Sequence, residues 1–411
     1  MKQKSLIIEK KAILISCIFM LFYTPKEYAV GHVIYTFWRY LSATISFLIV
    51  LVYILKSIKS QIDFKRYSVI VLYLLWMFVG SSLHSKYGEI KLMNFILSLG
   101  FCTFILLLFN IEEQRIIIKS YIIAGLTMSL IHFISFIIYR DIVGGMRHGA
   151  SYEMGGGVIG TTKQHWYFLT YDNDSIYYFI PIIVLLFYYS YRYNHKVYKI
   201  FFSYNIILIS MFISQLAAAC SITMLFVCTG YIYIYFHRRP RRFRSIAVYW
   251  KSILLGLFIN ILPIFILNSN IIALIASFFS KRSNLGRNQI WSLSLHYIGQ
   301  NLFLGQGHEP RSMTVRKIYQ THCHNTVIEH LYVGGIFGLV LFIILLISFR
   351  PRKQNPPDFS IAIFSIGIIA YFMTGAVDWL LTNHIPLAVF LFNSCINSYP
   401  KLDHERITKA I

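Results

Sequence analysis

Residues 280–323 read SKRSNLGRNQIWSLSLHYIGQNLFLGQGHEPRSMTVRKIYQTHC, followed at once by His324, Asn325 and the apolar run TVIEHLYVGGIFGLVLFIILLIS. This 44-residue polar stretch interrupts a chain that is otherwise built almost entirely of apolar runs. Apolar runs of roughly 17 to 25 residues cross a bilayer as helices, so the contrast decides the fold class. We expect the chemistry to lie at the interruption.

The composition indicates an all-α polytopic membrane protein. The chain is 57% hydrophobic and 13% charged with a mean hydropathy of +0.60, whereas soluble domains carry about 25% charged residues. We predict about 12 transmembrane helices in one integral membrane domain over residues 1–411. The predicted spans are 12–24, 32–55, 67–83, 92–109, 116–139, 175–192, 199–215, 219–236, 245–268, 325–348, 358–377 and 387–399.

The placement of Lys and Arg predicts the orientation, because short cytoplasmic loops retain positive charge. With both termini inside, the inner segments hold 23 of the 38 basic residues, the outer segments 12 and the spans 3. The two long loops, 140–174 and 269–324, then lie outside. The second, which precedes the late spans, holds half of the outward-facing positive charge and is expected to meet an anion.

Charge and cysteine content exclude other classes. The net charge of +22 follows the topology and attraction to anionic membrane lipid, and its division between two sides of a bilayer argues against nucleic acid. Five of the six cysteines lie in or beside predicted spans, so no disulfide framework is expected. The glycine-rich loop 140–174 lacks a nucleotide-binding pattern and is expected to be flexible.

Two residues of the polar stretch are candidates for chemistry. Arg287 lies four positions before Trp291, so on a helix both share a face, which Trp would hold at the lipid interface. There the arginine either anchors the helix or forks hydrogen bonds to a phosphate. His324 is either structural or a general base that titrates near neutral pH. Asn325 beside it can cap the helix or bind a sugar hydroxyl.

Other residues support this reading less directly. Arg39 lies about 10 Å inside its span, deep enough to point at an anion, and Glu329 is ionisable within a span. In the polar cluster Asp172-Asn173-Asp174-Ser175, either Asp174 or Ser175 caps the next helix or the cluster lines a sugar site. Gly334 and Gly338 have the spacing of close helix packing. Alternate residues on a helix do not converge, so the run 322–324 is not expected to bind a metal.

Four motifs together resemble the signature of the O-antigen ligase and O-antigen polymerase superfamily. They are Gly286-Arg287-x-x-Ile290-Trp291, Leu304-Gly305-Gln306-Gly307, His324-Asn325 and Gly334-Gly335-Ile336-Phe337-Gly338. The resemblance covers residues 286–338 and implies about a dozen spans with a large outer loop. It also implies glycosyl transfer from an undecaprenyl-pyrophosphate-linked glycan to a hydroxyl outside the cytoplasmic membrane, with no nucleotide sugar, metal or other cofactor.

In that resemblance Arg287 is the pyrophosphate clamp and His324 assists proton transfer from the acceptor. Many members carry a Ser-Arg pair in mid-chain, where this chain reads Ile213-Ser214-Gln215-Leu216 without an arginine. The candidates for the second phosphate contact are Arg39, Arg147, Lys163, Arg311 and Arg316.

The favoured function is a repeat-unit polymerase for O-antigen or capsule, which acts on lipid-linked oligosaccharide and has a chain-length regulator as a candidate partner. The alternatives are an O-antigen ligase acting on lipid A-core and a glycan flippase. The absence of a convincing internal repeat weighs against the flippase.

Overall fold

The computed structural model is a helical protein with one two-stranded hairpin among the residues that it describes. Those residues are 2–25, 30–57, 64–85, 88–139, 147–154, 157–165, 168–169, 175–214, 218–236, 246–266, 284–308, 323, 325–351, 359–376 and 384–398. Within these ranges the side chains of residues 2–7, 57, 64–65, 139, 218, 263–266, 284–289 and 397–398 and of both strands are not described.

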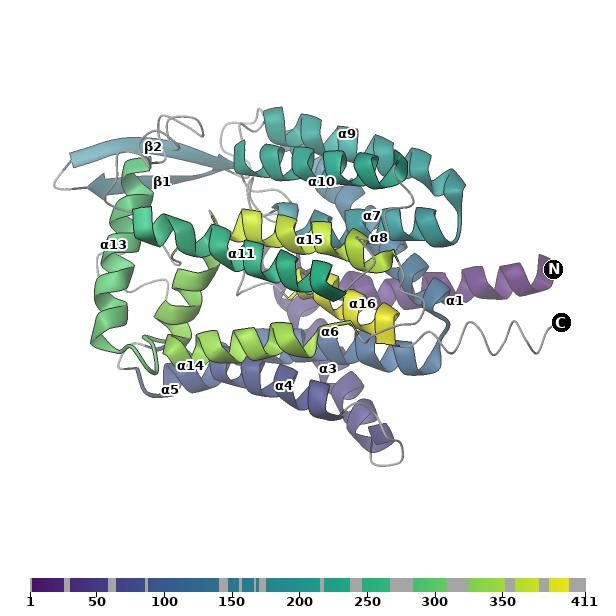
Figure 1. The fold of residues 1–411 in the computed structure, drawn as a ribbon, viewed down its shortest axis with the longest axis horizontal. Helices are drawn as coiled ribbons and strands as arrows, with labels where there is room; N and C mark the ends of the chain where they lie inside the picture. Colours follow the sequence, from purple (N-terminus) through teal and green to yellow (C-terminus); the bar gives the residue numbers. More distant parts are fainter. Residues whose placement is uncertain are drawn as a thin grey trace.

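Most helices run roughly along the long axis of the molecule, with the N-terminus at one end (Figure 1). In chain order these are α1 (Lys2–Leu21), α3 (His32–Ser57), α4 (Phe64–Leu75), α6 (Leu92–Ile111), α7 (Gln114–Tyr139), α8 (Ile176–Arg192), α9 (Tyr198–Ser214), α10 (Ala218–Phe236), α11 (Ile246–Ile266), α15 (Ser360–Gly375) and α16 (Leu387–Ser398). A π-helix, η1 (Trp76–Gly80), and the short α5 (Ser81–Leu83) continue α4.

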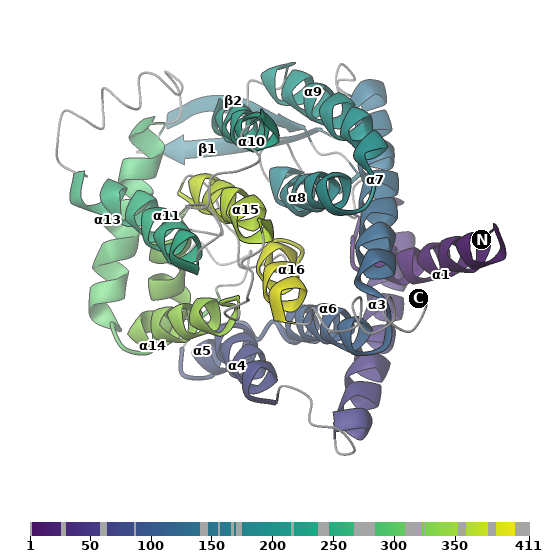
Figure 2. The same ribbon diagram turned by 45° about the vertical axis from the view of Figure 1, so that its right-hand side comes forward.

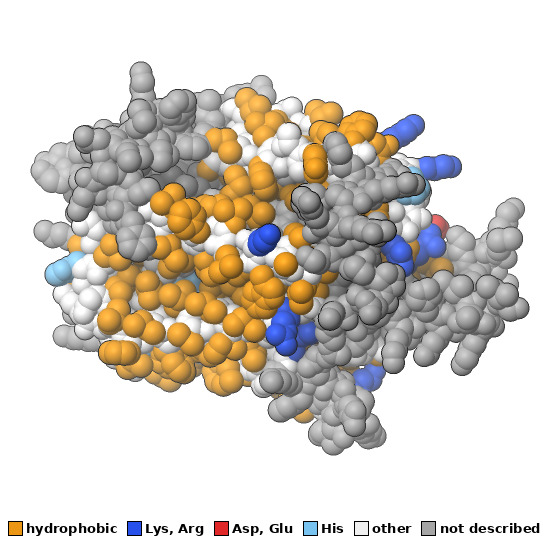
Figure 3. All heavy atoms as spheres, viewed as in Figure 1, with side chains coloured by type: hydrophobic (Ala, Val, Ile, Leu, Met, Phe, Trp, Pro, Cys, Tyr) orange, Lys and Arg blue, Asp and Glu red, His pale blue; other side chains and the backbone are white. Residues whose placement is uncertain are grey.

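The core of the bundle consists of α8, α15 and α16, which the other helices surround (Figure 2). In α8 every residue from Ile176 to Ser190 is buried. The outer helices instead expose large apolar side chains, such as Val33 at 79% and Phe37 at 65% on α3. Figure 3 shows a broad band of apolar side chains on the face over α10, α11 and α14, and such an area is stable only when covered by lipid or protein.

Helix length and hydropathy fit a membrane protein. Seven helices of the described part are long and apolar enough to cross a membrane, and four further apolar helices have 10–17 residues. Each of the twelve predicted spans overlaps a helix. The helical membrane architecture is confirmed, while the number of spans and the arrangement of the loops stay predictions.

The first long loop contains structure that the sequence does not predict. Strands β1 (Arg147–Met154) and β2 (Gly157–His165) pair antiparallel, with an irregularity between Tyr152 and Glu153. The hairpin lies at the end of the bundle opposite the N-terminus. Residues expected to be a flexible loop therefore include a paired hairpin.

The polar stretch also contains a helix, α13 (Asn284–Gln300), which lies across the same end of the bundle. The following helix, α14 (Thr326–Ser348), is not straight, because Gly335 has φ 65° and ψ −166°. The part before Gly335 lies beside α13, and the part after it runs with α4 (Figure 1). Residues 336–348 are only about 20 Å long at 1.5 Å per residue. The span predicted over 325–348 corresponds to an apolar helix, which is interrupted at Gly335.

Candidate functional site

The break in α14 is filled by residues 302–307, which follow α13. A helix interrupted within the membrane leaves backbone groups that must find partners inside the protein. Here the partners come from the loop: Gln306 N–H donates to Tyr332 O (2.6 Å), Gly307 N–H to Val333 O (3.0 Å), Ile336 N–H to Leu302 O (2.9 Å) and Phe337 N–H to Phe303 O (3.2 Å). The loop and the broken helix thus form one hydrogen-bonded unit.

Glycine is required at this junction by conformation and by space. Gly335 and Gly305 have φ values of 65° and 80°, which side chains other than glycine rarely adopt. A Cβ on Gly335 would lie 2.2 Å from Phe303 O, and one on Gly305 would lie 2.4 Å from Val333 O. The two glycines let the backbones meet.

The helix-packing role predicted for Gly334 and Gly338 agrees with their contacts. A Cβ on Gly334 would lie 2.8 Å from Met77 Sδ, and one on Gly338 would lie 3.0 Å from the same atom. The Trp76 indole N–H donates to Gly334 O at 3.0 Å. These glycines allow α14 to approach the π-helix η1 closely.

Asn325 caps α14 and joins it to two other helices. Its Oδ1 accepts the N–H groups of Val327 (3.0 Å) and Ile328 (3.1 Å). Its Nδ2 donates to the carbonyl oxygens of Asn260 (3.0 Å) and Ala376 (3.4 Å). A primary amide has two lone pairs and two N–H donors, so this buried side chain uses them all. Of the two expected roles, capping is observed, and the contacts leave no group for a sugar hydroxyl.

Asn260 of α11 and Thr326 of α14 complete this junction with hydrogen bonds to α15. Asn260 Nδ2 donates to Phe372 O at 2.9 Å, and Thr326 Oγ1 donates to Gly375 O at 3.1 Å. The Asn260 Oδ1 atom is buried and has no hydrogen-bond partner among the described residues. An amide inside an apolar run is a sequence signal that could have identified Asn260, which was missed.

Cys323 links α13 to the start of α14. The Trp291 indole N–H donates to Cys323 O at 2.9 Å, and the Ser294 hydroxyl contacts Cys323 Sγ at 3.2 Å. The Cys323 N–H donates to Glu329 Oε2 at 2.6 Å. Trp291 is only 6% exposed, so the prediction that it anchors α13 at the lipid interface was wrong. It packs inside the protein and fixes the end of the polar stretch.

The two proposed catalytic residues flank this contact along the chain. Arg287 lies in α13, one turn before Trp291, and its side chain is outside the described part. His324 is also outside it, between Cys323 and Asn325, which are both buried.

Most of the other predicted site residues also lack a described side chain. Arg147 lies in β1 without a described side chain, and the residues outside the described part are Asp172, Asn173, Arg311 and Arg316. Within the described part no three His, Cys, Asp or Glu side chains gather as a metal site.

A second histidine on α14, His330, is occupied by structural contacts. Its Nδ1 is 2.6 Å from Thr326 O, which only accepts, so Nδ1 carries the proton. Its Nε2 then accepts from the Tyr73 hydroxyl at 3.0 Å, and its ring stacks on Phe342 at 4.1 Å. Both nitrogens are used, so this buried imidazole positions α14 against α4.

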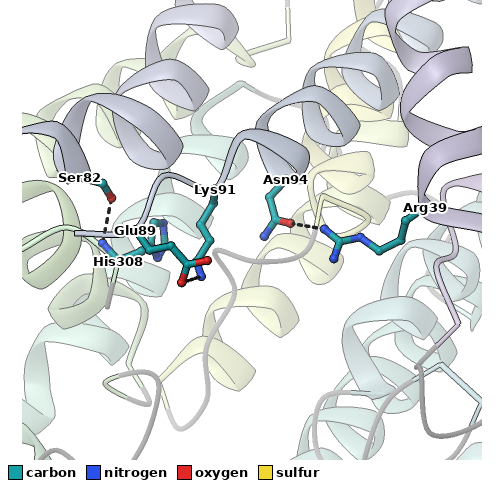
Figure 4. Close-up of polar contacts among 6 residues, drawn as sticks. All are labelled: Arg39, Ser82, Glu89, Lys91, Asn94 and His308. Carbon is teal, nitrogen blue, oxygen red and sulfur yellow. Dashed lines mark hydrogen bonds and ion pairs between the residues drawn. The ribbon is translucent and has the colours of Figure 1, made fainter. Parts of the chain in front are cut away.

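Arg39 lies apart from this junction, between the N-terminal parts of α3 and α6. Its Nη1 donates to the Tyr35 hydroxyl at 2.9 Å and its Nη2 to Asn94 Oδ1 at 3.4 Å. Figure 4 shows Lys91 next to Asn94 and paired with Glu89. The sequence singled out Arg39 but not Asn94 or Lys91.

His308 connects this group to the loop of residues 302–307. The Glu89 N–H donates to His308 O at 2.6 Å, and the His308 N–H donates to the Ser82 hydroxyl at 3.2 Å. Its ring stacks on Phe78. Burial, and then the charge of Lys91, lower the pKa of His308 to about 4.

Comparison with known proteins identifies the family of the motif-bearing segment. Residues 206–343 match the family model described as O-Antigen ligase. That range extends from α9 to α14 and includes all four motifs. No curated protein matches the chain. Members of the family are membrane glycosyltransferase-like enzymes acting on lipid-linked oligosaccharides. The predicted resemblance is therefore confirmed over residues 206–343, which are similar to the O-Antigen ligase family.

Proposed function

We propose that the protein is a polysaccharide repeat-unit polymerase of the bacterial cytoplasmic membrane, with both termini in the cytoplasm. It transfers a glycan from undecaprenyl pyrophosphate to a hydroxyl of another lipid-linked repeat unit. The family match supports glycosyl transfer in general. The end of the molecule carrying the N-terminus displays Lys and Arg side chains (Figure 3), as expected for a cytoplasmic surface.

One contact carries the assignment of the site: the hydrogen bond from Trp291 Nε1 to Cys323 O. It ties the helix that bears Arg287 to the residue before His324, although the two ends of the polar stretch are far apart in sequence. Asn325 then fixes the other side of His324 against α11 and α15. A cationic clamp and a base supplied from two ends of one loop are what this transfer requires.

The proposed step is balanced without any other reactant. The bond between the donor sugar C1 and the diphosphate oxygen breaks, and a bond forms between C1 and the acceptor oxygen. His324 takes the acceptor proton as a general base. Arg287 stabilises the charge that develops on the leaving lipid diphosphate, since fixed donors are most effective where charge appears.

The test uses the full-length purified protein and a lipid-pyrophosphate-linked repeat unit as the sole substrate. A polymerase produces lipid-linked glycans of two and more units. We expect His324→Ala and Arg287→Ala each to abolish extension while the membrane levels stay normal. His296→Ala is the matched control, because His296 is exposed on α13. Chain-length ladders like wild type from both site variants would refute the assignment.

The ligase is the rival within the same family, because the motifs do not separate the acceptors. A ligase leaves the repeat unit unextended in this assay and transfers glycan only when lipid A-core is added. In cells, loss of a polymerase leaves one-unit surface glycan, whereas loss of a ligase leaves full-length glycan on the lipid carrier. The transporter alternative gains no support from the family match.

A further inference from the structure

Arg39 is a charged residue on a helix, α3, whose exposed side chains are mostly apolar. It lies seven residues after His32, the first residue of α3, or about 10 Å along the helix. Its neighbours Phe37 and Tyr40 are 65% and 63% exposed. An ionisable side chain at such a depth is costly and usually serves a function.

The contacts of Arg39 do not neutralise its charge. The groups that it meets, the Tyr35 hydroxyl and the Asn94 amide oxygen, are both neutral. No carboxylate among the described residues is within ion-pair distance of it. A guanidinium has five N–H donors, so most of them stay available for an anion.

A second positive group lies beside this arginine, the N-terminus of α6. The first N–H groups of a helix have no partner within it, and Lys91 provides no side-chain cap. Asn94, which contacts Arg39, belongs to the first turn of the 20-residue α6. The uncapped helix end and the guanidinium thus face one region, and both attract anions.

Lys91 and Glu89 adjust the charge of this region. They form an ion pair of 2.5 Å, and Figure 4 shows Glu89 on the side of Lys91 away from Arg39. The carboxylate therefore reduces the attraction that Lys91 exerts on an anion. Replacing the Glu89 carboxylate with an amide leaves the Lys91 charge free to attract an anion.

We propose that Arg39, Asn94 and the N-terminus of α6 bind the diphosphate of a lipid-linked glycan, as a docking site for the acceptor lipid. The identity of this lipid rests on the proposed function. The reaction brings two lipid diphosphates to one enzyme, and Arg287 is assigned to the donor. The Arg39 group opens onto the lipid-facing side of α3, and Glu89 and His308 connect it to the loop that follows α13.

The test counts bound lipids on the full-length protein in phosphatidylcholine nanodiscs by native mass spectrometry, with a polyprenyl diphosphate as the probe. Arg39→Gln should remove one bound diphosphate, or weaken its binding about tenfold or more, as expected for a charge-assisted contact. Glu89→Gln should strengthen it. Arg115→Gln is the matched control, because Arg115 also contacts a tyrosine hydroxyl, at the opposite end of the bundle.

Two results overturn the proposal. One is the same number of bound diphosphates in the Arg39→Gln and Arg115→Gln proteins. The other is displacement of the probe by an equal concentration of phosphatidylglycerol, which would make this a site for ordinary phospholipid. A failure of the proposed function is distinguishable, because then the wild type extends no glycan although Arg39→Gln still removes one bound probe.

Discussion

Replacement of Asn325 by aspartate separates a simple helix cap from the three-helix junction. Aspartate and asparagine are about equally good N-caps, and a negative charge at a helix N-terminus is favourable. A residue that only capped α14 would therefore tolerate this change. In the structure, however, the Nδ2 group donates to the carbonyl oxygens of Asn260 and Ala376. A carboxylate there would meet two acceptors with no hydrogen to share.

The magnitude follows from the contacts that are lost. Asn325 is fully buried, and each buried carbonyl left without its donor costs about 1 to 3 kcal/mol. For two carbonyls, Asn325→Asp should therefore destabilise the protein by about 2 to 6 kcal/mol despite the intact cap. Asn325→Ala also loses the cap, which adds about 1 kcal/mol. Asn325→Ser restores only the cap and should lie between alanine and wild type.

Thermal unfolding of the purified protein in detergent, followed by intrinsic fluorescence, measures this order. Glycan extension should fall in the same order, because the junction positions the neighbouring His324. Thr326→Val is a useful comparison, since it removes a single hydrogen bond to α15 and should cost about 1 kcal/mol. If Asn325→Asp unfolds within a degree of wild type, the junction does not hold α14, and Asn325 is a cap alone.

Two further predictions concern, first, the break in α14 at Gly335 and, second, His308, which directly follows the loop of residues 302–307. Gly335→Ala should destabilise the protein by about 3 kcal/mol or more, because of its backbone conformation and the collision of the new Cβ with Phe303 O. Gly299→Ala is the control: its Cβ would have nothing within 4 Å, so it should stabilise α13 by up to about 1 kcal/mol. Equal melting temperatures of the two variants would contradict this prediction. Because the pKa of His308 is lowered to about 4, the unfolded chain binds its proton at higher pH than the folded one, so stability should fall as the pH drops from about 6.5 toward 4. His308→Gln should flatten that part of the curve of melting temperature against pH, and an unchanged slope would show that another group is responsible.

The helices could be predicted from the sequence because lipid imposes a simple requirement. A backbone in hydrocarbon must satisfy its own hydrogen bonds, so long apolar runs become helices whatever their neighbours are. The predicted stretches 92–109 and 219–236, for example, correspond to α6 (Leu92–Ile111) and α10 (Ala218–Phe236). Local pattern was sufficient there.

The break at Gly335 could not be predicted in the same way. Its backbone conformation is satisfied only by donors and acceptors from residues 302–307, and no local pattern reports that contact. The adjacent glycines Gly334 and Gly335 were a signal, but they fit close helix packing equally well. Trp291 was misplaced for the same reason, because its partner Cys323 lies 32 residues away.

These contacts reduce the number of motif residues that are available for chemistry. Gly305 and Gly335 allow two backbones to cross, and Gly334 and Gly338 allow α14 to approach Met77. Asn325 has every hydrogen-bonding group of its side chain engaged with the protein.

The two motif residues assigned to chemistry, Arg287 and His324, have side chains outside the described part. Trp291, four positions after Arg287, and Cys323, directly before His324, share a hydrogen bond. The glycines, the tryptophan and the asparagine of the motifs hold two segments together that are distant in sequence. We propose that these segments carry the cation and the base of the reaction. The division of labour predicts that scaffold variants lose stability and activity together, whereas changes at Arg287 and His324 remove activity from a protein that still folds.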